Sequence, residues 1–398
     1  MSSIMTSSKL IKSIQLRGFI PQSQKTFLDQ DFLDIATEKI NISLMREIMT
    51  ARGDYLIYYK DIPLVSGVQS YAIPDRAHGD KLRDASIVDI NGKTKRELTQ
   101  VSLEELTDYT NDYIMGTVYS PFYLQNNNLV LINTNVNSGD SIRMYFYMRP
   151  NMLVVESRAA TVLALSQTSE VDHISPKTGA VTGISLTGVI TSVGHGLTTG
   201  NKVSFTGTDS SPAINDIYPI TVIDTNHFSI PTTVTSTGTT GSWALAADVY
   251  TISSSNFPKH FTTSLLYDVV NSSSPNNIKL YNVPANSING ITKSMTFRVQ
   301  DTGTALAMGN YITSAEETIV PNVPTEYHPV VAQMVAVHCM ESMADEQQKK
   351  SANNTLAEMK RDILSIVQNR VEGAPKKIKN RNSTLTASTN RNTFRRRG

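Results

Sequence analysis

The chain has 398 residues, enough for two or three domains, and 39% of them are apolar, enough to form a hydrophobic core in each. The single cysteine, Cys339, excludes an intramolecular disulfide and fits synthesis in a reducing cytoplasm. No segment approaches the about 20 apolar residues of a membrane-spanning helix, and residues 1–19 contain no apolar run long enough for a signal peptide. We therefore expect a folded protein that is neither membrane-inserted nor secreted through a signal peptide.

The formal net charge of +1 is unevenly distributed. Residues 370–398 contain nine Lys or Arg and one acidic residue, Glu372, so this segment carries +8 and the rest of the chain −7. The sequence predicts a mildly acidic body with a strongly basic tail.

The first predicted unit, residues 1–53, is an N-terminal arm followed by a helix. Apolar residues recur at helical spacing from residue 27 to residue 52, Gly53 follows as a C-terminal stop, and we expect an interruption near residues 41–43. Packing in the core is the simplest role for this apolar face. Its members are Phe32, Ile35, Ala36, Ile40, Leu44, Met45, Ile48 and Met49.

The next unit is a predicted antiparallel β domain in two parts, residues 54–177 and 246–323. Short β-branched and aromatic runs such as YLIYY, NLVLINT and SIRMYFYM alternate with Pro, Gly, Asn and Asp, and similar runs such as DVYTISS and SMTFRVQD return after residue 246. Between the strands, SLEELTDY predicts a short helical segment with Ser102 as its N-cap and Glu105 three residues on.

Residues 178–245 differ in composition from both flanks. They are rich in Gly and Thr, carry almost no charge and keep a strand-like pattern, which predicts a small inserted β-barrel that projects from a common base.

Residues 324–373 predict a C-terminal helical hairpin. The first helix has an apolar face from Val330 to Met343 and tolerates Pro329 in its first turn. The second has apolar residues from Leu356 to Ile366 at steps of three and four, a short coiled-coil-like seam. Residues 374–398 have no periodicity and few apolar residues, which predicts a flexible basic tail.

The predicted fold class is therefore α+β. We expect a helical bundle formed by the N- and C-terminal helices, a central antiparallel β-sandwich or barrel domain, and the inserted small β-barrel.

The sequence lacks the common motifs of nucleotide-binding, catalytic and metal sites. It contains no nucleotide-binding glycine loop, no GxSxG elbow, no HExxH and no CxxC. His338 and Glu341 are three residues apart on one helix, with His328 and Asp345 nearby, but a solvated helix face is the better interpretation because a metal site needs three or four converging ligands. We expect no metal, no cofactor and no enzymatic activity.

Three single residues also favour structural roles. His195 lies between two glycines, which indicates a tight turn rather than a catalytic base. Cys339 lies among apolar helical residues and is expected to be buried, not nucleophilic. Trp243 could stack on a sugar, but closing the core of the inserted barrel is the favoured role.

The basic tail is the main functional candidate. It could simply aid solubility, or it could dock into an acidic groove or onto phosphates and become ordered there. The apolar residues Ile378 and Phe394 among the cations favour a docking arm, and repetition around a ring would strengthen weak single contacts. The expected docking residues are Lys376, Lys377, Ile378, Lys379, Arg381, Arg391, Phe394, Arg395, Arg396 and Arg397.

The C-terminal third, GNYITSAEETIVPNVPTEYHPVVAQMVAVHCMESMADEQQKKSANNTLAEMKRDILSIVQNRVEGAPKKIKNR, resembles the family of bacteriophage head-to-tail connector proteins, also called neck or adaptor ring proteins. The resemblance is based on a glycine-led segment at 309–312, an acidic loop at 316–317, a Pro-x-x-Pro connection at 321–324, a helix start at 324–329 and the helices and basic tail that follow. The family's usual Gly-Asp is Gly-Asn at 309–310 here. Residues 45–74 and 128–153 are similar to the helix and β framework of the same family, so the resemblance covers most of the chain except the insert.

The resemblance implies a virion protein, assembled in the bacterial host cytoplasm, that acts in virus assembly and DNA ejection. It implies a homo-oligomeric ring, commonly a dodecamer, that binds the portal protein and downstream tail or neck proteins, lets genomic DNA pass through its lumen and contacts no membrane. An acidic body suits such a conduit because it repels the phosphate backbone.

Three other functions compete with this interpretation. The first is a receptor- or glycan-binding tail protein that uses the inserted β-barrel. The second is a virion-associated hydrolase, which would need a carboxylate pair or a metal cluster. The third is a nucleic-acid-binding factor whose nine tail cations would give a salt dependence with a slope of roughly −8.

Overall fold

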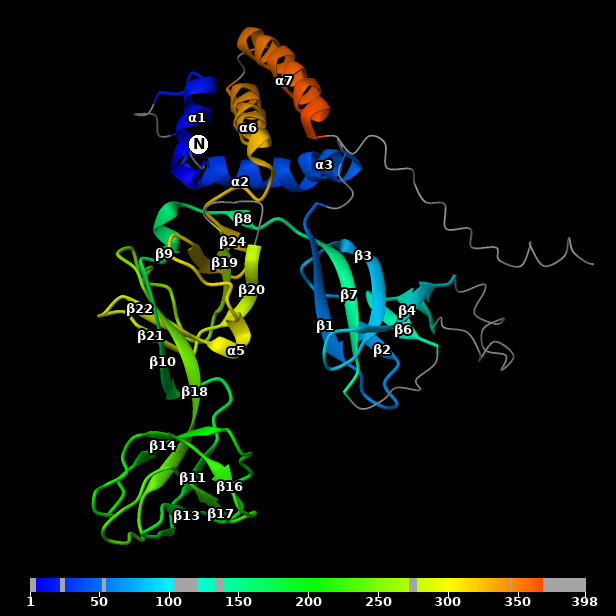
Figure 1. The fold of residues 1–398 in the computed structure, drawn as a ribbon. Helices are drawn as coiled ribbons and strands as arrows, with labels where there is room; N and C mark the ends of the chain where they lie inside the picture. Colours follow the sequence, from blue (N-terminus) through cyan, green and yellow to red (C-terminus); the bar gives the residue numbers. More distant parts are fainter. Residues whose placement is uncertain are drawn as a thin grey trace, which may run out of the picture.

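The computed structural model describes residues 5–21, 26–51, 55–102, 120–132, 139–271, 278–343 and 346–367. The fold is mixed α+β, as the sequence predicts. Figure 1 shows the helices from the two ends of the chain gathered at one end of the molecule, two β units beneath them and the inserted module at the opposite end. The predicted helical segment near residue 105 and the tail at 374–398 lie outside the described residues.

The helices form a layer around α6, which is buried on nearly all sides. Because α6 consists mostly of Val, Ala and Met with little polar surface, it packs against α1, α2 and α7 together. Pro329 occupies its first turn, where a missing backbone N–H costs no helix hydrogen bond. The helices of the layer are α1 (Ser7–Arg17), α2 (Asp29–Lys39), α3 (Met45–Ala51), α6 (His328–Ser342) and α7 (Glu346–Val367).

The helix expected over residues 27–52 is interrupted near the predicted position. A π-helical turn, Ile40–Leu44, separates α2 from α3 and keeps the apolar face directed at the core, with Ile40 and Leu44 buried. Helix α1 lies within the segment predicted only as an arm. Its buried Leu10, Ile11 and Ile14 have helical spacing, a signal that the sequence contains.

The first β unit is a seven-stranded sheet in the order β1-β7-β3-β4-β5-β6-β2. All neighbours are antiparallel except β4 and β5. Along β7, Ile142, Met144, Phe146 and Met148 are buried on one face, as the alternating sequence SIRMYFYM predicts. The strands are β1 (Ile57–Pro63), β2 (Ser70–Ala72), β3 (Ala77–Val88), β4 (Thr94–Gln100), β5 (Ser120–Gln125), β6 (Asn128–Leu131) and β7 (Ser141–Met148).

The second β unit packs a four-stranded sheet, β20-β19-β23-β9, over a sheet built on β18. Phe297 of the β18 sheet and Tyr267 of the four-stranded sheet meet in the shared core with their rings edge to face. Its elements are β8 (Met152–Leu153), β9 (Ala160–Thr161), β10 (Ala164–Val171), β18 (Ser242–Ser253), β19 (Leu266–Val270), β20 (Ile278–Pro284), β21 (Ser287–Asn289), β22 (Ser294–Arg298), α5 (Val299–Thr302), β23 (Tyr311–Ser314) and β24 (Glu317–Thr318).

Strand pairing thus divides the predicted β domain in two. Among the described residues, β1 to β7 pair only with one another, whereas β8, β9 and β10 pair with strands from the second half of the chain. The segment 54–177 therefore contributes to two β units instead of forming one with 246–323. Alternation in a sequence locates strands but does not say which strands pair.

The inserted module has its own hydrophobic core, which includes Phe205, Phe228 and Trp243. Strand β18 continues from this module into the second β unit and pairs with β11 and β14 at one end and with β10 and β22 at the other. The other strands of the module are β11 (Thr178–Ala180), β12 (Gly183–Ile184), β13 (Val189–Thr191), β14 (Lys202–Thr206), β15 (Ile217–Pro219), β16 (Thr221–Val222) and β17 (His227–Ser229).

Candidate functional site

The predicted docking residues of the tail lie outside the described residues, which end at Val367, so their docking role stays a prediction. These residues are Lys376, Lys377, Ile378, Lys379, Arg381, Arg391, Phe394, Arg395, Arg396 and Arg397.

Two of the four residues considered as metal ligands have other partners. His328 is buried, its Nε2 lies 3.1 Å from the Val323 carbonyl oxygen, and burial lowers its pKa. Glu341 pairs with Lys349 at 2.9 Å, and Asp345 lies outside the described residues. Within the described segments, no three His, Cys, Asp or Glu side chains are grouped closely enough to hold a metal ion.

His195 is a structural residue of the inserted module. Its Nδ1 accepts a hydrogen bond of 3.0 Å from the Leu197 N–H, so the proton is assigned to Nε2, which donates to the Asp224 carbonyl oxygen at 2.9 Å. The ring is 7% exposed and meets Phe228 edge to face. Both ring nitrogens are therefore occupied by backbone groups.

Trp243 and Cys339 also pack in cores. Trp243 is 2% exposed, and its Nε1 donates to Ser192 Oγ at 2.8 Å, so its ring is not available to stack on a sugar. Cys339 is fully buried in α6, and burial raises the pKa of its thiol to about 11.

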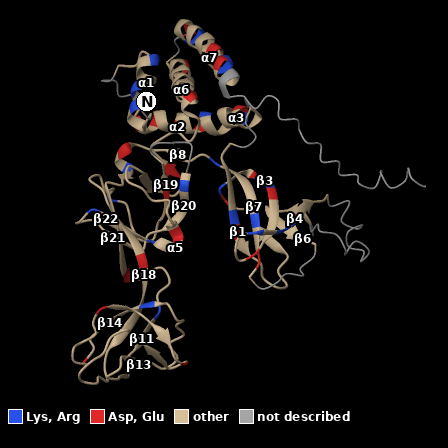
Figure 2. Ribbon diagram, viewed as in Figure 1, with Lys and Arg blue, Asp and Glu red and all other residues tan. Residues whose placement is uncertain are grey.

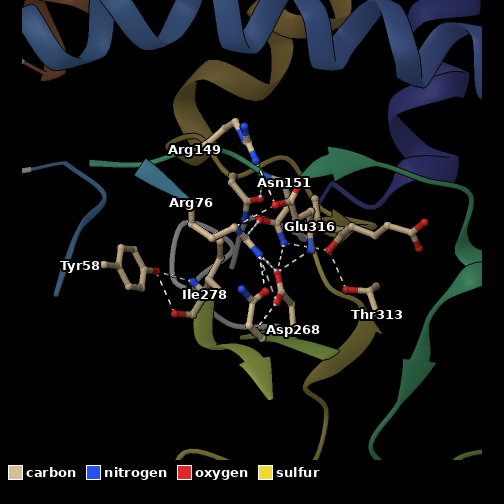
Figure 3. Close-up of polar contacts among 12 residues, drawn as sticks. Tyr58, Arg76, Arg149, Asn151, Asp268, Ile278, Thr313 and Glu316 are labelled. Atoms are coloured by element: carbon tan, nitrogen blue, oxygen red, sulfur yellow. Dashed lines mark hydrogen bonds and ion pairs between the residues drawn. The ribbon is translucent and has the colours of Figure 1, made fainter. Parts of the chain in front are cut away.

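A buried polar network joins the two β units directly below the helices (Figure 3). We call it the polar junction: Arg76, Asn151 and Asp268 form its buried centre, the more exposed Arg149, Asn282 and Glu316 lie at its edge, and Tyr58 makes a separate link. Arg76 lies in the turn between β2 and β3, and Asp268 lies in β19. Both Nη atoms of Arg76 lie 3.0 Å from Asp268 Oδ2, and the two side chains are 2% and 0% exposed.

The Asp268 carboxylate binds three further donors. It accepts from Asn151 Nδ2 at 2.7 Å and from the backbone N–H groups of Asn282 at 3.0 Å and Glu316 at 3.1 Å. Asn151 Oδ1 in turn accepts a hydrogen bond from Arg76. The ion pair therefore has enough hydrogen bonds to offset much of the cost of removing it from water.

Tyr58 provides a second link between the β units. Its hydroxyl donates to the Ile278 carbonyl oxygen and accepts from the Ile278 N–H, both at 2.8 Å, which joins β1 to β20. Burial raises the pKa of this phenol far above its ordinary value of 10, so Tyr58 stays neutral.

The chain next to the polar junction forms a buried connection between the second β unit and α6. Eight consecutive residues, Glu317–Pro324, are buried. Asn322 accepts hydrogen bonds from the Asn151 N–H at 3.0 Å and the Tyr55 hydroxyl at 3.1 Å, and the Ser7 N–H donates to the Ile319 carbonyl oxygen at 2.7 Å. Both β units and α1 are thus bonded to this one connection.

The polar junction holds chain segments together and offers no reactive group to a ligand. Arg76 and Asp268 neutralise each other, and the hydrogen bonds around them fix one geometry. Arg76 Nε has no hydrogen-bond partner among the described residues and lies 4.0 Å from Glu316 Oε1. This junction was not predictable from the sequence, because Arg76 and Asp268 are 192 residues apart. The one signal in the sequence was a charged residue, Asp268, inside the apolar segment LLYDVV.

Charged residues lie on the helices and on the first β unit. Figure 2 shows acidic and basic residues along α7 and α2, whereas the inserted module is nearly uncharged. No helix in the described part of the chain is long and apolar enough to cross a membrane. No protein-family model matches this sequence, and no curated protein matches it either.

Proposed function

We propose that this chain is a structural subunit of a bacteriophage head-to-tail connector, a neck or adaptor ring that joins the portal to the tail and forms part of the DNA conduit. The observation that carries the proposal is the buried connection Glu317–Pro324. The resemblance to the connector family covers this segment. In it, Ile319 accepts a hydrogen bond from α1, and Asn322 accepts hydrogen bonds from residues just before β1 and β8. The resemblance therefore concerns residues that this fold needs.

The architecture suits a subunit that acts by assembly. We take the terminal helices as one bundle, with the second β unit as a sandwich and the inserted module as a small barrel that projects from it. The polar junction holds the two β units in a fixed relation, which subunits of a closed ring require because an angular error would repeat at every interface.

The basic tail supplies the contact with the portal in this proposal. Residues 370–398 carry +8, and the rest of the chain carries −7. Surface ion pairs each contribute only about 0–1 kcal/mol, so one tail binds weakly, but simultaneous binding of many tails around a ring gives avidity. We also propose that the acidic body forms the wall of the conduit, where it repels the phosphate backbone and lets DNA slide. A lumen lined mainly by basic side chains would contradict this.

Removal of residues 374–398 tests this contact. We expect the shortened protein to keep its circular dichroism spectrum and melting temperature and to lose binding to purified portal rings in a sedimentation assay. The double variant Ile378→Ser and Phe394→Ser keeps every tail cation. Weaker portal binding by this variant would show that the two apolar side chains contribute to docking in addition to the charges. Unchanged portal binding by the shortened protein would contradict the docking role.

One observation supports the alternative of a receptor- or glycan-binding protein. The inserted module has its own core and lies at the end of the molecule opposite the helices (Figure 1). Under this alternative, loss of residues 178–245 would prevent adsorption to host cells and leave neck assembly intact. For the nucleic-acid-binding alternative, a salt-independent affinity for DNA would exclude binding through the tail cations.

A further inference from the structure

The end of α1 displays two large apolar side chains. Leu16 is 79% exposed, and Phe19, just after the helix, is 76% exposed, although its neighbours Gly18 and Ile20 are buried. Phe19 has a φ of +52°, a left-handed conformation that non-glycine residues rarely adopt. Such conformations occur where the surrounding structure imposes them, often at binding sites.

A groove of about 290 Å³ lies elsewhere on the helical layer, between the π-helical turn, α6 and α7. Its apolar lining is Ile42, Met334, Val337 and Leu356. Ile42 is 71% exposed on the π-helical turn, so apolar surface continues from the groove to solvent. The volume suits one or two large apolar side chains.

Charge around the two surfaces is complementary. Helix α1 has three cations and no acidic residue, and Lys12 lies one turn before Leu16. The rim of the groove carries Glu38 and Glu341, whose side chains are 56% and 57% exposed. Each carboxylate is ion-paired with a lysine that is less exposed, Lys39 at 27% and Lys349 at 22%, so the carboxylates are the more exposed members of these pairs.

The two surfaces lie at different places on the molecule. Leu16 and Phe19 are at the end of α1, whereas the groove is lined by residues of α2, the π-helical turn, α6 and α7. A surface and a complementary groove at different places on one chain generate a head-to-tail contact, which closes into a ring when the rotation between copies permits.

We propose that a second copy of this chain occupies the groove, so that Leu16 and Phe19 of one copy pack against Ile42, Val337 and Leu356 of the next. Lys12 then faces the carboxylates of Glu38 and Glu341 across the contact. This inference rests on the proposed connector ring and identifies the face through which neighbouring subunits join.

Cysteine cross-linking tests the contact directly. Phe19→Cys and Ile42→Cys are made as separate proteins, each exposed enough to fold normally, and Cys339 is retained because it is fully buried. We expect a disulfide-linked species when the two proteins are mixed and oxidised and much less from either alone. Val193→Cys, 79% exposed on the inserted module, replaces Phe19→Cys in the matched control.

Association is measured in parallel by light scattering. Phe19→Ser should weaken association on the order of a hundredfold, since burial of a large apolar side chain is lost, whereas Ile90→Ser, at a residue 84% exposed next to the first β unit's strand β3, should not. Oligomers that form without the cross-link, or that are insensitive to Phe19→Ser, would overturn the inference but leave the proposed ring. A protein that stays monomeric at every concentration and on portal rings would overturn both.

Discussion

Replacement of Asp268 by Asn should break the polar junction without creating a cavity, because the two side chains have nearly the same volume. The change removes the negative charge and places an amide NH2 among groups that are themselves donors: Arg76, Asn151 and two backbone N–H groups. Arg76, 2% exposed, then keeps the amide oxygens of Asn151 and Asn282 and the half-exposed Glu316 carboxylate, which lies 4.0 Å from its Nε. A buried charge that loses its partner costs about 3–5 kcal/mol, and we expect a loss of stability in this range.

Urea denaturation at neutral pH measures the loss through two signals. Far-ultraviolet circular dichroism follows the whole chain, whereas fluorescence of the single tryptophan, Trp243, follows the inserted module, which has its own core. Asp268→Asn should strongly shift the unfolding transition seen by circular dichroism and only slightly shift the one seen by Trp243 fluorescence. The control is Asp248→Asn, whose ion pair with Lys202 is more than one third exposed and contributes only about 0–1 kcal/mol.

A loss from Asp268→Asn no larger than that of the control would refute the assigned role of the polar junction. The reasoning also fails if the Trp243 transition shifts as much as the circular dichroism transition, because the effect would then not be confined to the contact between the β units.

Three further predictions concern single side chains. A Cβ at Gly179 would lie 2.6 Å from the Trp243 indole, so Gly179→Ala should destabilise the inserted module by about 1–3 kcal/mol in tryptophan-monitored melting, whereas Gly290→Ala, with open space around it, should not. Cys339 should resist thiol reagents at pH 8 until the protein unfolds, and rapid labelling of the folded protein would contradict its burial in α6. Burial raises the pKa of Tyr267 from 10 to about 12, so the stability that its neutral phenol contributes is complete below pH 10 and is lost as pH rises through 12. Alkaline titration should show this loss, and Tyr267→Phe should reduce it.

The helices were predictable because their signals are local. The apolar periodicity and Pro329 located α6, and the break in the pattern near residue 41 corresponds to the π-helical turn. Helix α1 has the same kind of signal in Leu10, Ile11 and Ile14 but belongs to a segment that we predicted as an arm.

The arrangement of the β units could not be predicted, because pairing joins distant parts of the chain. Strand β8 pairs with β24, and β10 pairs with β18, although runs of alternating residues fit many partners equally well. The polar junction has the same origin, since Arg76 and Asp268 become partners only when two separate β units meet. The groove beside Ile42 likewise depends on helix packing from both ends of the chain.

Difference imaging of intact virions by electron microscopy tests the central claim most directly. An antibody fragment raised against residues 178–245 marks the inserted module, which lies away from the helices and the proposed subunit contact. The connector proposal predicts added density at the collar between capsid and tail, repeated around the axis. Density at fibre tips would favour the receptor-binding alternative, and particles that lack this chain would contradict its assignment to the virion.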